Sequence, residues 1–158
     1  MRITKYQVRM DEEKHPVLVK DNAVNYGDDH LSSPDRIAKM CNGVFGLQDM
    51  AEEHVYAIAM SAKCRVLGVF ELSHGTIQQT TLASRELFVR LLLVGAASFA
   101  IVHNHPSGDP TPSNTDLQCT KKLCEASKMM DIEFLDHIIL GENGTFHSIR
   151  EESGSIFS

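Results

Sequence analysis

The stretch that decides both the fold and the chemistry of this chain is residues 98–116, SFAIVHNHPSGDPTPSNTD. Its first half is apolar up to the histidines, which predicts a buried β-strand. His103 and His105 are two residues apart, and side chains at that spacing on an extended strand end point to the same side. Both imidazoles can therefore reach a single ion.

The second half of the stretch returns the chain to a helix. Three prolines and a glycine stiffen residues 106–112, and Ser113 begins a helix that carries Asp116 in its first turn. Two histidines and one carboxylate are good ligands for Zn²⁺, and water at a fourth position makes such a site catalytic rather than structural. We therefore predict that His103, His105 and Asp116 bind one Zn²⁺.

Each of these features also has a plainer interpretation. Ser113 and Asp116 have the spacing of a helix capping box, which needs no metal. A histidine pair at a strand end is often a surface feature, and loops rich in proline and glycine are common. Only the combination of a buried strand, a stiff loop and a carboxylate at a helix start favours a metal site.

Composition limits the partners that the chain can have. The 158 residues are enough for one domain with its own core, and the hydrophobic content of 42% is ordinary for a globular protein. The net charge is −6, Trp is absent and aromatic residues make up 6%. This composition lacks the basic surface of a DNA-binding protein and the aromatic surface that stacks on single strands, so we expect nucleic-acid binding to be weak or indirect.

The cysteines and the apolar segments suggest a cytoplasmic protein. The four cysteines form no CxxC pair, and the charged N-terminus MRITKYQVRM does not resemble a signal peptide. The most apolar segment, residues 87–102, is interrupted by Arg90 and Gly95 and is too short to span a bilayer. We expect reduced thiols and no membrane span, while the oligomeric state stays open.

The pattern along the chain predicts an α/β domain. Residues 1–31 are interpreted as an N-terminal appendage, residues 32–150 as the catalytic domain and residues 151–158 as a flexible tail. Strands are expected where apolar runs are short and bounded by turn residues, at 3–10, 17–19, 54–60, 64–72, 98–105, 132–140 and 145–149. Helices are expected from Ser33-Pro34 to about Asn42-Gly43, over a mostly buried segment that ends at Gly95, and from Ser113 to Met130.

Residues 103–116, HNHPSGDPTPSNTD, resemble a known signature. They fit the His-x-His-x(7)-Ser-x(2)-Asp pattern of JAB/MPN metalloproteases, and more narrowly they are similar to the RadC family. LDHIIL and ELSHGT resemble RadC proteins too, and the likeness covers residues 34–150. The resemblance implies a JAB/MPN (cytidine-deaminase-like) fold, a mixed central sheet flanked by helices. It also implies zinc-dependent hydrolysis of an amide bond in a peptide or isopeptide substrate, with a link to DNA repair or mobile elements.

The chain departs from the RadC pattern in two places. RadC proteins usually carry an N-terminal helix-hairpin-helix region, and we expect this chain to be a short form without it. Many relatives have Val-His-Pro-Arg-Glu where this chain has Leu-Ala-Ser-Arg-Glu at 82–86, so Arg85 and Glu86 are kept.

The resemblance also implies an upstream glutamate that takes a proton from the attacking water and passes it to the leaving amine. We favour Glu71, at the end of a strand, because a lone glutamate in an apolar strand is costly if it faces inward. Glu86, Glu52 and Glu53 are alternatives. Ser113 is expected to stabilise the oxyanion, in competition with its capping role. Asp136-His137 either orients a metal ligand or is a satisfied buried pair.

Several other function classes compete with the peptidase. The main alternative is a DNA-repair-associated nuclease or DNA-binding factor, although HNH nucleases spread their residues over a ββα unit, unlike the adjacent residues 103–105. A zinc deaminase needs His-x-Glu and Pro-Cys-x-x-Cys, which the chain lacks. A metal-free binding module is disfavoured because all the ligands are kept.

Overall fold

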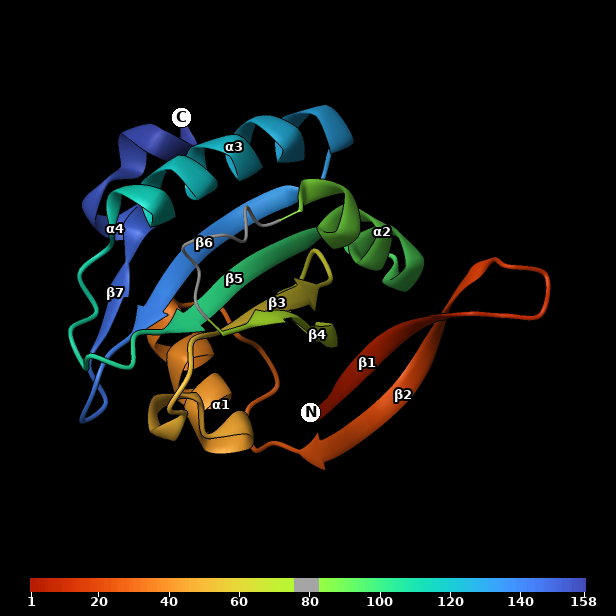
Figure 1. Cartoon of the computed structure of the whole chain (residues 1–158), viewed down its shortest axis with the longest axis horizontal. Helices are drawn as coiled ribbons and strands as arrows, with labels where there is room; N and C mark the ends of the chain where they lie inside the picture. The colour runs from red at the N-terminus through yellow and green to blue at the C-terminus, as the bar shows by residue number, and fades with distance from the viewer. Residues whose placement is uncertain (76–82) are drawn as a thin grey trace.

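The computed structural model describes residues 1–75 and 83–158, and it confirms the predicted α/β class. In the described part, seven strands form one mixed sheet with the order β2-β1-β4-β3-β5-β6-β7 (Figure 1). The strands are β1 (Arg2–Met10), β2 (Pro16–Asn25), β3 (His54–Met60), β4 (Val66–His74), β5 (Ser98–Asn104), β6 (Glu133–Leu140) and β7 (Phe146–Ser148).

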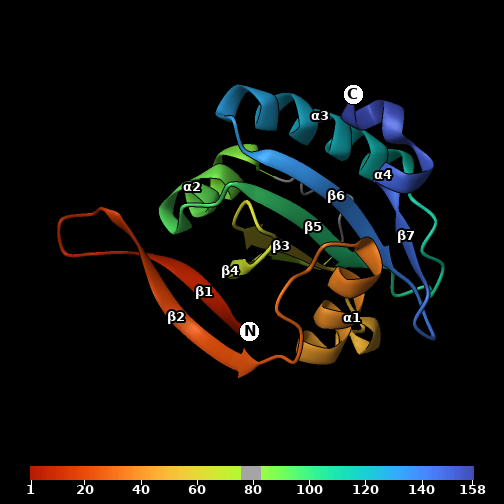
Figure 2. The same ribbon diagram turned by 180° about the vertical axis from the view of Figure 1, so that it is seen from behind.

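Helices cover both faces of the sheet. α1 (Pro34–Phe45) lies on one face, and α2 (Ser84–Val94) and α3 (Asn114–Met130) lie on the other, with α4 (Ile149–Glu152) near α3 (Figures 1 and 2). Alternate residues of each strand point to opposite faces, so the sheet has two separate cores. Ile58 and Val102 face α1, whereas Phe99 and Ile101 face α2 and α3.

β5 is buried along its whole length because it lies between β3 and β6 in the middle of the sheet. It pairs antiparallel with β3 and parallel with β6, and α3 makes the crossover that a parallel pair requires. The carboxyl end of β5 therefore leads directly into the loop before α3. The predicted ligands lie around this loop.

The largest differences from the predicted boundaries are in α1 and β2. α1 does not end near Asn42-Gly43 but continues to Phe45, because Gly46 takes the left-handed conformation, with φ of 62°, and its N–H bonds to the carbonyl of Asn42. β2 is ten residues long rather than a short strand at 17–19, because β1 offers it a partner along nearly its full length.

The second helix prediction is right in position and wrong in burial. α2 ends at Gly95 as expected, but Leu92 and Leu93 are exposed and only one side of the helix packs on the sheet. Leu82 and Thr76, which belong to stretches compared above with RadC, lie outside the described residues. No helix in residues 1–75 or 83–158 is long and apolar enough to cross a membrane.

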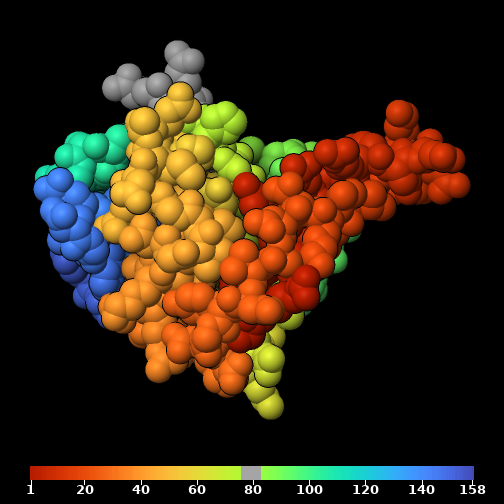
Figure 3. Space-filling model, turned by 90° about the horizontal axis from the view of Figure 1, so that it is seen from below, coloured from red at the N-terminus to blue at the C-terminus, as the bar shows by residue number. Residues whose placement is uncertain are grey.

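The two end segments both contact the sheet. Residues 1–31 contain the β1–β2 hairpin, which joins the sheet through a parallel pairing of Lys5 with Val69 and then projects from the body as an arm (Figure 3). In residues 151–158, the ring of Phe157 lies 5.2 Å from that of Phe134 on β6.

Candidate metal centre

Side chains from three parts of the chain converge at the carboxyl end of β5. His103 is the penultimate residue of β5, His105 follows the strand, Asp116 lies in the first turn of α3, and Glu53 directly precedes β3. One possible ligand atom from each of the four lies within 4.8 Å of the others. The structure therefore brings together the three predicted ligands and adds a glutamate.

The distances between these atoms fit a tetrahedral ion. His103 Nε2 lies 3.1 Å from His105 Nε2, 3.4 Å from an oxygen of Asp116 and 3.4 Å from an oxygen of Glu53. His105 Nε2 lies 3.5 Å from the other oxygen of Asp116. Ligand atoms about 2.0–2.1 Å from a tetrahedral Zn²⁺ are about 3.3–3.4 Å apart. His103, His105 and Asp116 thus have the spacing that the ligands of such an ion need, and Glu53 lies close to the same point.

A chain of hydrogen bonds fixes the tautomer of His103. The Thr120 hydroxyl donates its proton to the carbonyl of Asp116 at 2.8 Å, so it accepts a bond at 2.7 Å from His137 Nδ1. His137 Nε2 is then an acceptor, and it receives the bond at 2.8 Å that His103 Nδ1 donates. His103 Nε2 is left as a lone pair that faces the site.

His105 is oriented in the same way by a backbone carbonyl. Its Nδ1 donates to the carbonyl of Asp109 at 2.8 Å, which leaves Nε2 as an acceptor toward the site. Two imidazole lone pairs and two carboxylates therefore converge on one point. Acceptors in this arrangement repel one another unless a cation or a proton lies between them.

The ionisation of these groups follows from burial and from their partners. Burial lowers the pKa of His137 to about 4 and that of His103 well below its usual range, so both are neutral. Burial raises the pKa of Asp116, but the hydrogen bond to His105, the electrostatic interaction with His103 and the bonds from Ser113 lower it by more, so the net shift is downward. The bond to Asp116 raises the pKa of His105, so a proton and a metal ion compete for its Nε2.

Ser113 is placed beside Asp116 by a complete capping box. Its hydroxyl and its backbone N–H donate to Asp116 Oδ2 at 2.6 and 2.7 Å, and the same hydroxyl accepts from the N–H of Asp116 at 3.2 Å. The hydroxyl proton is thus directed at the carboxylate that faces the two histidines, and Ser113 holds that carboxylate in place.

The structure does not bring Glu71 into this group. β4 pairs Glu71 with Tyr56, whereas β5 pairs His103 with Val55, so the two side chains lie on opposite faces of the sheet. Glu71 bonds Lys5 Nζ at 2.8 Å and His54 Nδ1 at 2.9 Å. Burial raises its pKa, but the bonds to Lys5 and His54 lower it by more.

Among the alternative glutamates, only Glu53 reaches the cluster. Glu86 pairs with Arg85 at 2.7 Å on exposed α2, and the Glu52 side chain is exposed. Glu53 lies on the face of His103 because it is two residues before Val55, the partner of His103. The alternation of side chains is the signal that identifies it once the strand pairing is known.

The neighbours Asp136 and His137 have different roles, because they too point to opposite faces. His137 orients His103, as described above. Asp136 accepts bonds from the Ser148 hydroxyl and from the backbone N–H groups of His137 and Arg150, so it holds the end of β7 and the start of α4.

The loop that carries His105 is clamped by the turn after β6. The N–H of His105 bonds the carbonyl of Leu140, and the N–H of Glu142 bonds that of Gly108, both at 2.9 Å. Between them, Gly141 lies so close that an added Cβ would be 2.5 Å from the Gly108 carbonyl oxygen. The position therefore admits only glycine without a shift of the loop.

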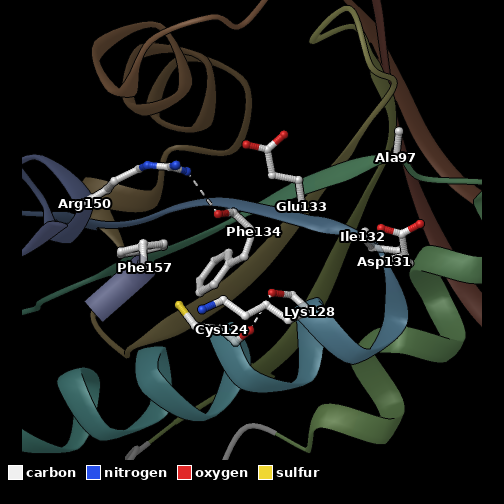
Figure 4. Close-up of a pocket in the computed structure, with 10 residues that line it drawn as sticks. Ala97, Cys124, Lys128, Asp131, Ile132, Glu133, Phe134, Arg150 and Phe157 are labelled. Atoms are coloured by element: carbon white, nitrogen blue, oxygen red, sulfur yellow. Dashed lines mark hydrogen bonds between the residues drawn. The ribbon is translucent and has the colours of Figure 1, made fainter. Parts of the chain in front are cut away.

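Two hollows lie at opposite ends of the central strands. A groove of about 340 Å³ beside the metal centre is lined by Ala51, Glu52, Glu53, Gly75 and Pro106. A hollow of about 420 Å³ lies where β5 and β6 begin (Figure 4). There Arg150 bonds the carbonyls of Phe134 and Leu135, and Lys128 bonds that of Ser158, so these cations serve the fold. Only the first hollow adjoins the converging acceptors.

The fold and the site define the class of this protein. It is an α/β domain with a His-His-carboxylate centre at the end of a central strand. The chain belongs to the RadC-like JAB domain family, whose model matches residues 31–154, and its mixed sheet and helices are consistent with the JAB/MPN fold. The site that it presents is a possible metal-binding group.

Curated relatives share this part of the chain. A UPF0758 protein of Clostridium acetobutylicum is 44% identical over 122 residues, which cover 77% of this chain and 52% of the relative. A UPF0758 protein of Desulforamulus reducens is 45% identical over 97 residues, 61% of this chain and 43% of the relative. The chain thus spans about half the length of these relatives.

Proposed function

We propose that this chain is a zinc-dependent hydrolase that cleaves an amide or isopeptide bond in a peptide substrate. The observation that carries the proposal is the convergence of His103 Nε2, His105 Nε2 and the Asp116 carboxylate beside a fourth acceptor, Glu53. This donor set suits Zn²⁺. The ion, when bound, supplies a polarising charge that lets a water molecule attack a carbonyl at neutral pH.

Glu53 is the residue best placed to move protons in this reaction. Its side chain is 17% exposed, against 1% for His103, and it also lines the groove. A carboxylate there takes a proton from the attacking water and delivers it to the leaving amine. This assigns to Glu53 the general-base role that the sequence interpretation gave to Glu71.

The remaining residues orient these groups. His137 and Thr120 hold His103 in the tautomer that presents Nε2, which is how partners of ligating histidines act in metal sites. Ser113 orients Asp116, and the proposed donation of its hydroxyl to an oxyanion competes with this bond. The net charge of −6 supports a peptide substrate over the alternative of a nuclease or DNA-binding factor.

The test compares the zinc-loaded parent with two glutamate variants. Each is incubated with peptides from a denatured cell lysate, and new termini are quantified by mass spectrometry. Glu53→Gln should keep its zinc and lose roughly two to four orders of magnitude in cleavage rate. Glu71→Gln, the matched control, should cleave at the parental rate. An active Glu53→Gln with an inactive Glu71→Gln would reverse the assignment, and an inactive zinc-loaded parent would contradict the proposed function.

A further inference from the structure

Asn104, between the two histidine ligands, has no part in the metal centre itself. Its side chain is on the opposite side of the strand from those of His103 and His105, and it is 1% exposed. A buried amide needs partners for its oxygen and its nitrogen. Both sets of partners belong to the segment that precedes β3.

The bonds of Asn104 surround Glu53. The Asn104 side-chain oxygen accepts from the N–H of His54 at 2.8 Å, and its nitrogen donates to the carbonyl of Glu52 at 3.0 Å and to that of Met50 at 3.4 Å. The carbonyl of Glu52 and the N–H of His54 belong to the two peptide groups on either side of the Glu53 Cα. One side chain thus holds both peptide planes of Glu53.

The side-chain bonds of Asn104 take over at the point where the backbone pairing of β3 with β5 ends. The ladder between β3 and β5 runs from Met60 with Ser98 to Val55 with His103, and it does not include Glu53. Beyond this point the N–H of His54 bonds the side chain of Asn104 rather than a backbone carbonyl. Glu53 is therefore tied to the same strand that carries the two histidines.

We propose that Asn104 is a positioning residue that sets the Glu53 carboxylate against the metal ligands; this inference rests on the proposed function. To hold both peptide groups of Glu53, the side chain at position 104 needs one hydrogen-bond acceptor and two donors at the end of a short side chain. Aspartate keeps the acceptor but directs a carboxylate at two carbonyl oxygens. Serine is too short to reach both peptide groups. Asparagine has both the length and the combination of acceptor and donors that this position requires.

The experiment combines a kinetic cycle with a measurement that does not depend on activity. Asn104→Ser and Asn104→Asp are made in the parent and in Glu53→Gln, with Asn22→Ser as the control. Asn22 is exposed on β2, and its side-chain oxygen accepts from the neighbouring N–H of Ala23. Zinc content, kcat and KM on a peptide that the parent cleaves, and the hydrogen exchange rate of the His54 amide are measured.

In the parent, either Asn104 variant should keep one zinc, lower kcat by roughly ten- to a hundredfold and leave KM within about twofold, as expected for a displaced catalytic group. In Glu53→Gln the same substitution should change kcat by less than about twofold, because Asn104 acts through Glu53. The His54 amide should exchange faster in both variants and not in Asn22→Ser.

Three results of the kinetic and zinc measurements would overturn the proposal. They are a parental kcat in both Asn104 variants, an equal loss of kcat with and without Glu53, and loss of zinc in a folded variant. If one of the two Asn104 variants fails to fold, the other still tests the proposal. A zinc-loaded parent that cleaves no peptide would contradict the proposed function alone, while an unchanged exchange rate of the His54 amide would still contradict the role of Asn104.

Discussion

The two faces of the sheet beside β3 gather similar residues and use them differently. Glu53 and His54 are neighbours in sequence, but Glu53 faces the metal centre and His54 faces Glu71 on the other side. On the far face Lys5 supplies a positive charge 2.8 Å from Glu71. On the metal face the atoms that converge, from two histidines and two carboxylates, are all acceptors. On the far face, the lysine balances the charge of the glutamate beside the histidine, so these side chains form an ion cluster. On the metal face, the glutamate and the histidines meet a second carboxylate instead, so the converging acceptors form a possible cation-binding group.

The largest expected effect comes from removing the two histidines of the metal face. Removing two histidines of the far face is the matched control. The parent, purified without added metal, should contain about one zinc per chain, and His103→Ala/His105→Ala should contain almost none because two of its ligands are lost. His54→Ala/His74→Ala removes the same number of imidazoles from the far face and should keep its zinc. Elemental analysis measures both, and full zinc in the first variant would contradict the assignment of the ligands.

The convergence of His103, His105 and Asp116 was predictable from sequence because these residues lie within one short stretch of known local geometry. The alternation of a strand places His103 and His105 together, and the capping pattern at Ser113 places Asp116. Glu53 was one of four candidates because its place depends on the register of β3 against β5, which no local pattern encodes. Glu71 was preferred because a lone glutamate in an apolar strand is costly if it faces inward, and Lys5, the partner that stabilises it, is 66 residues away in the sequence.

The same division between local and distant signals holds for the fold. The hairpin of β3 and β4, the buried strand β5 and the ends of α2 and α3 follow from apolar patterns, caps and glycines. The length of β2 depends on pairing with β1, and the end of α1 depends on which of two nearby glycines takes the left-handed conformation. These features were missed because they are decided by tertiary partners.

A smaller effect is expected from a glycine that lies against the loop of the metal face. Gly141→Ala places a methyl group against the Gly108 carbonyl, the Thr145 hydroxyl and the Pro110 ring. Overpacking of this kind costs about 1–3 kcal/mol, and here the strain falls on the loop that carries His105. We expect a lower free energy of unfolding, measured with urea, and weaker zinc binding. Gly27→Ala meets nothing within 4 Å and serves as the control. Equal zinc affinity in parent and Gly141→Ala would show that the clamp does not position His105.

The smallest effect is expected on the far face, where the charges are already balanced. Burial raises the pKa of Glu71, but the bonds to Lys5 and His54 lower it by more, to below its ordinary value, so its ionised form stabilises the folded state. This contribution is complete above the unfolded pKa and is lost as the pH falls through the lower, folded one. Glu71→Gln removes it. In metal-free protein the parent should exceed Glu71→Gln in free energy of unfolding by about 0.2–1 kcal/mol at pH 7, as for a partly exposed pair. The difference should shrink as the pH is lowered from about 5 to 3, and urea denaturation at several pH values measures it. A difference that grows on acidification would mean that Glu71 is bound as the neutral acid, and its pairing with Lys5 would then not explain the far face.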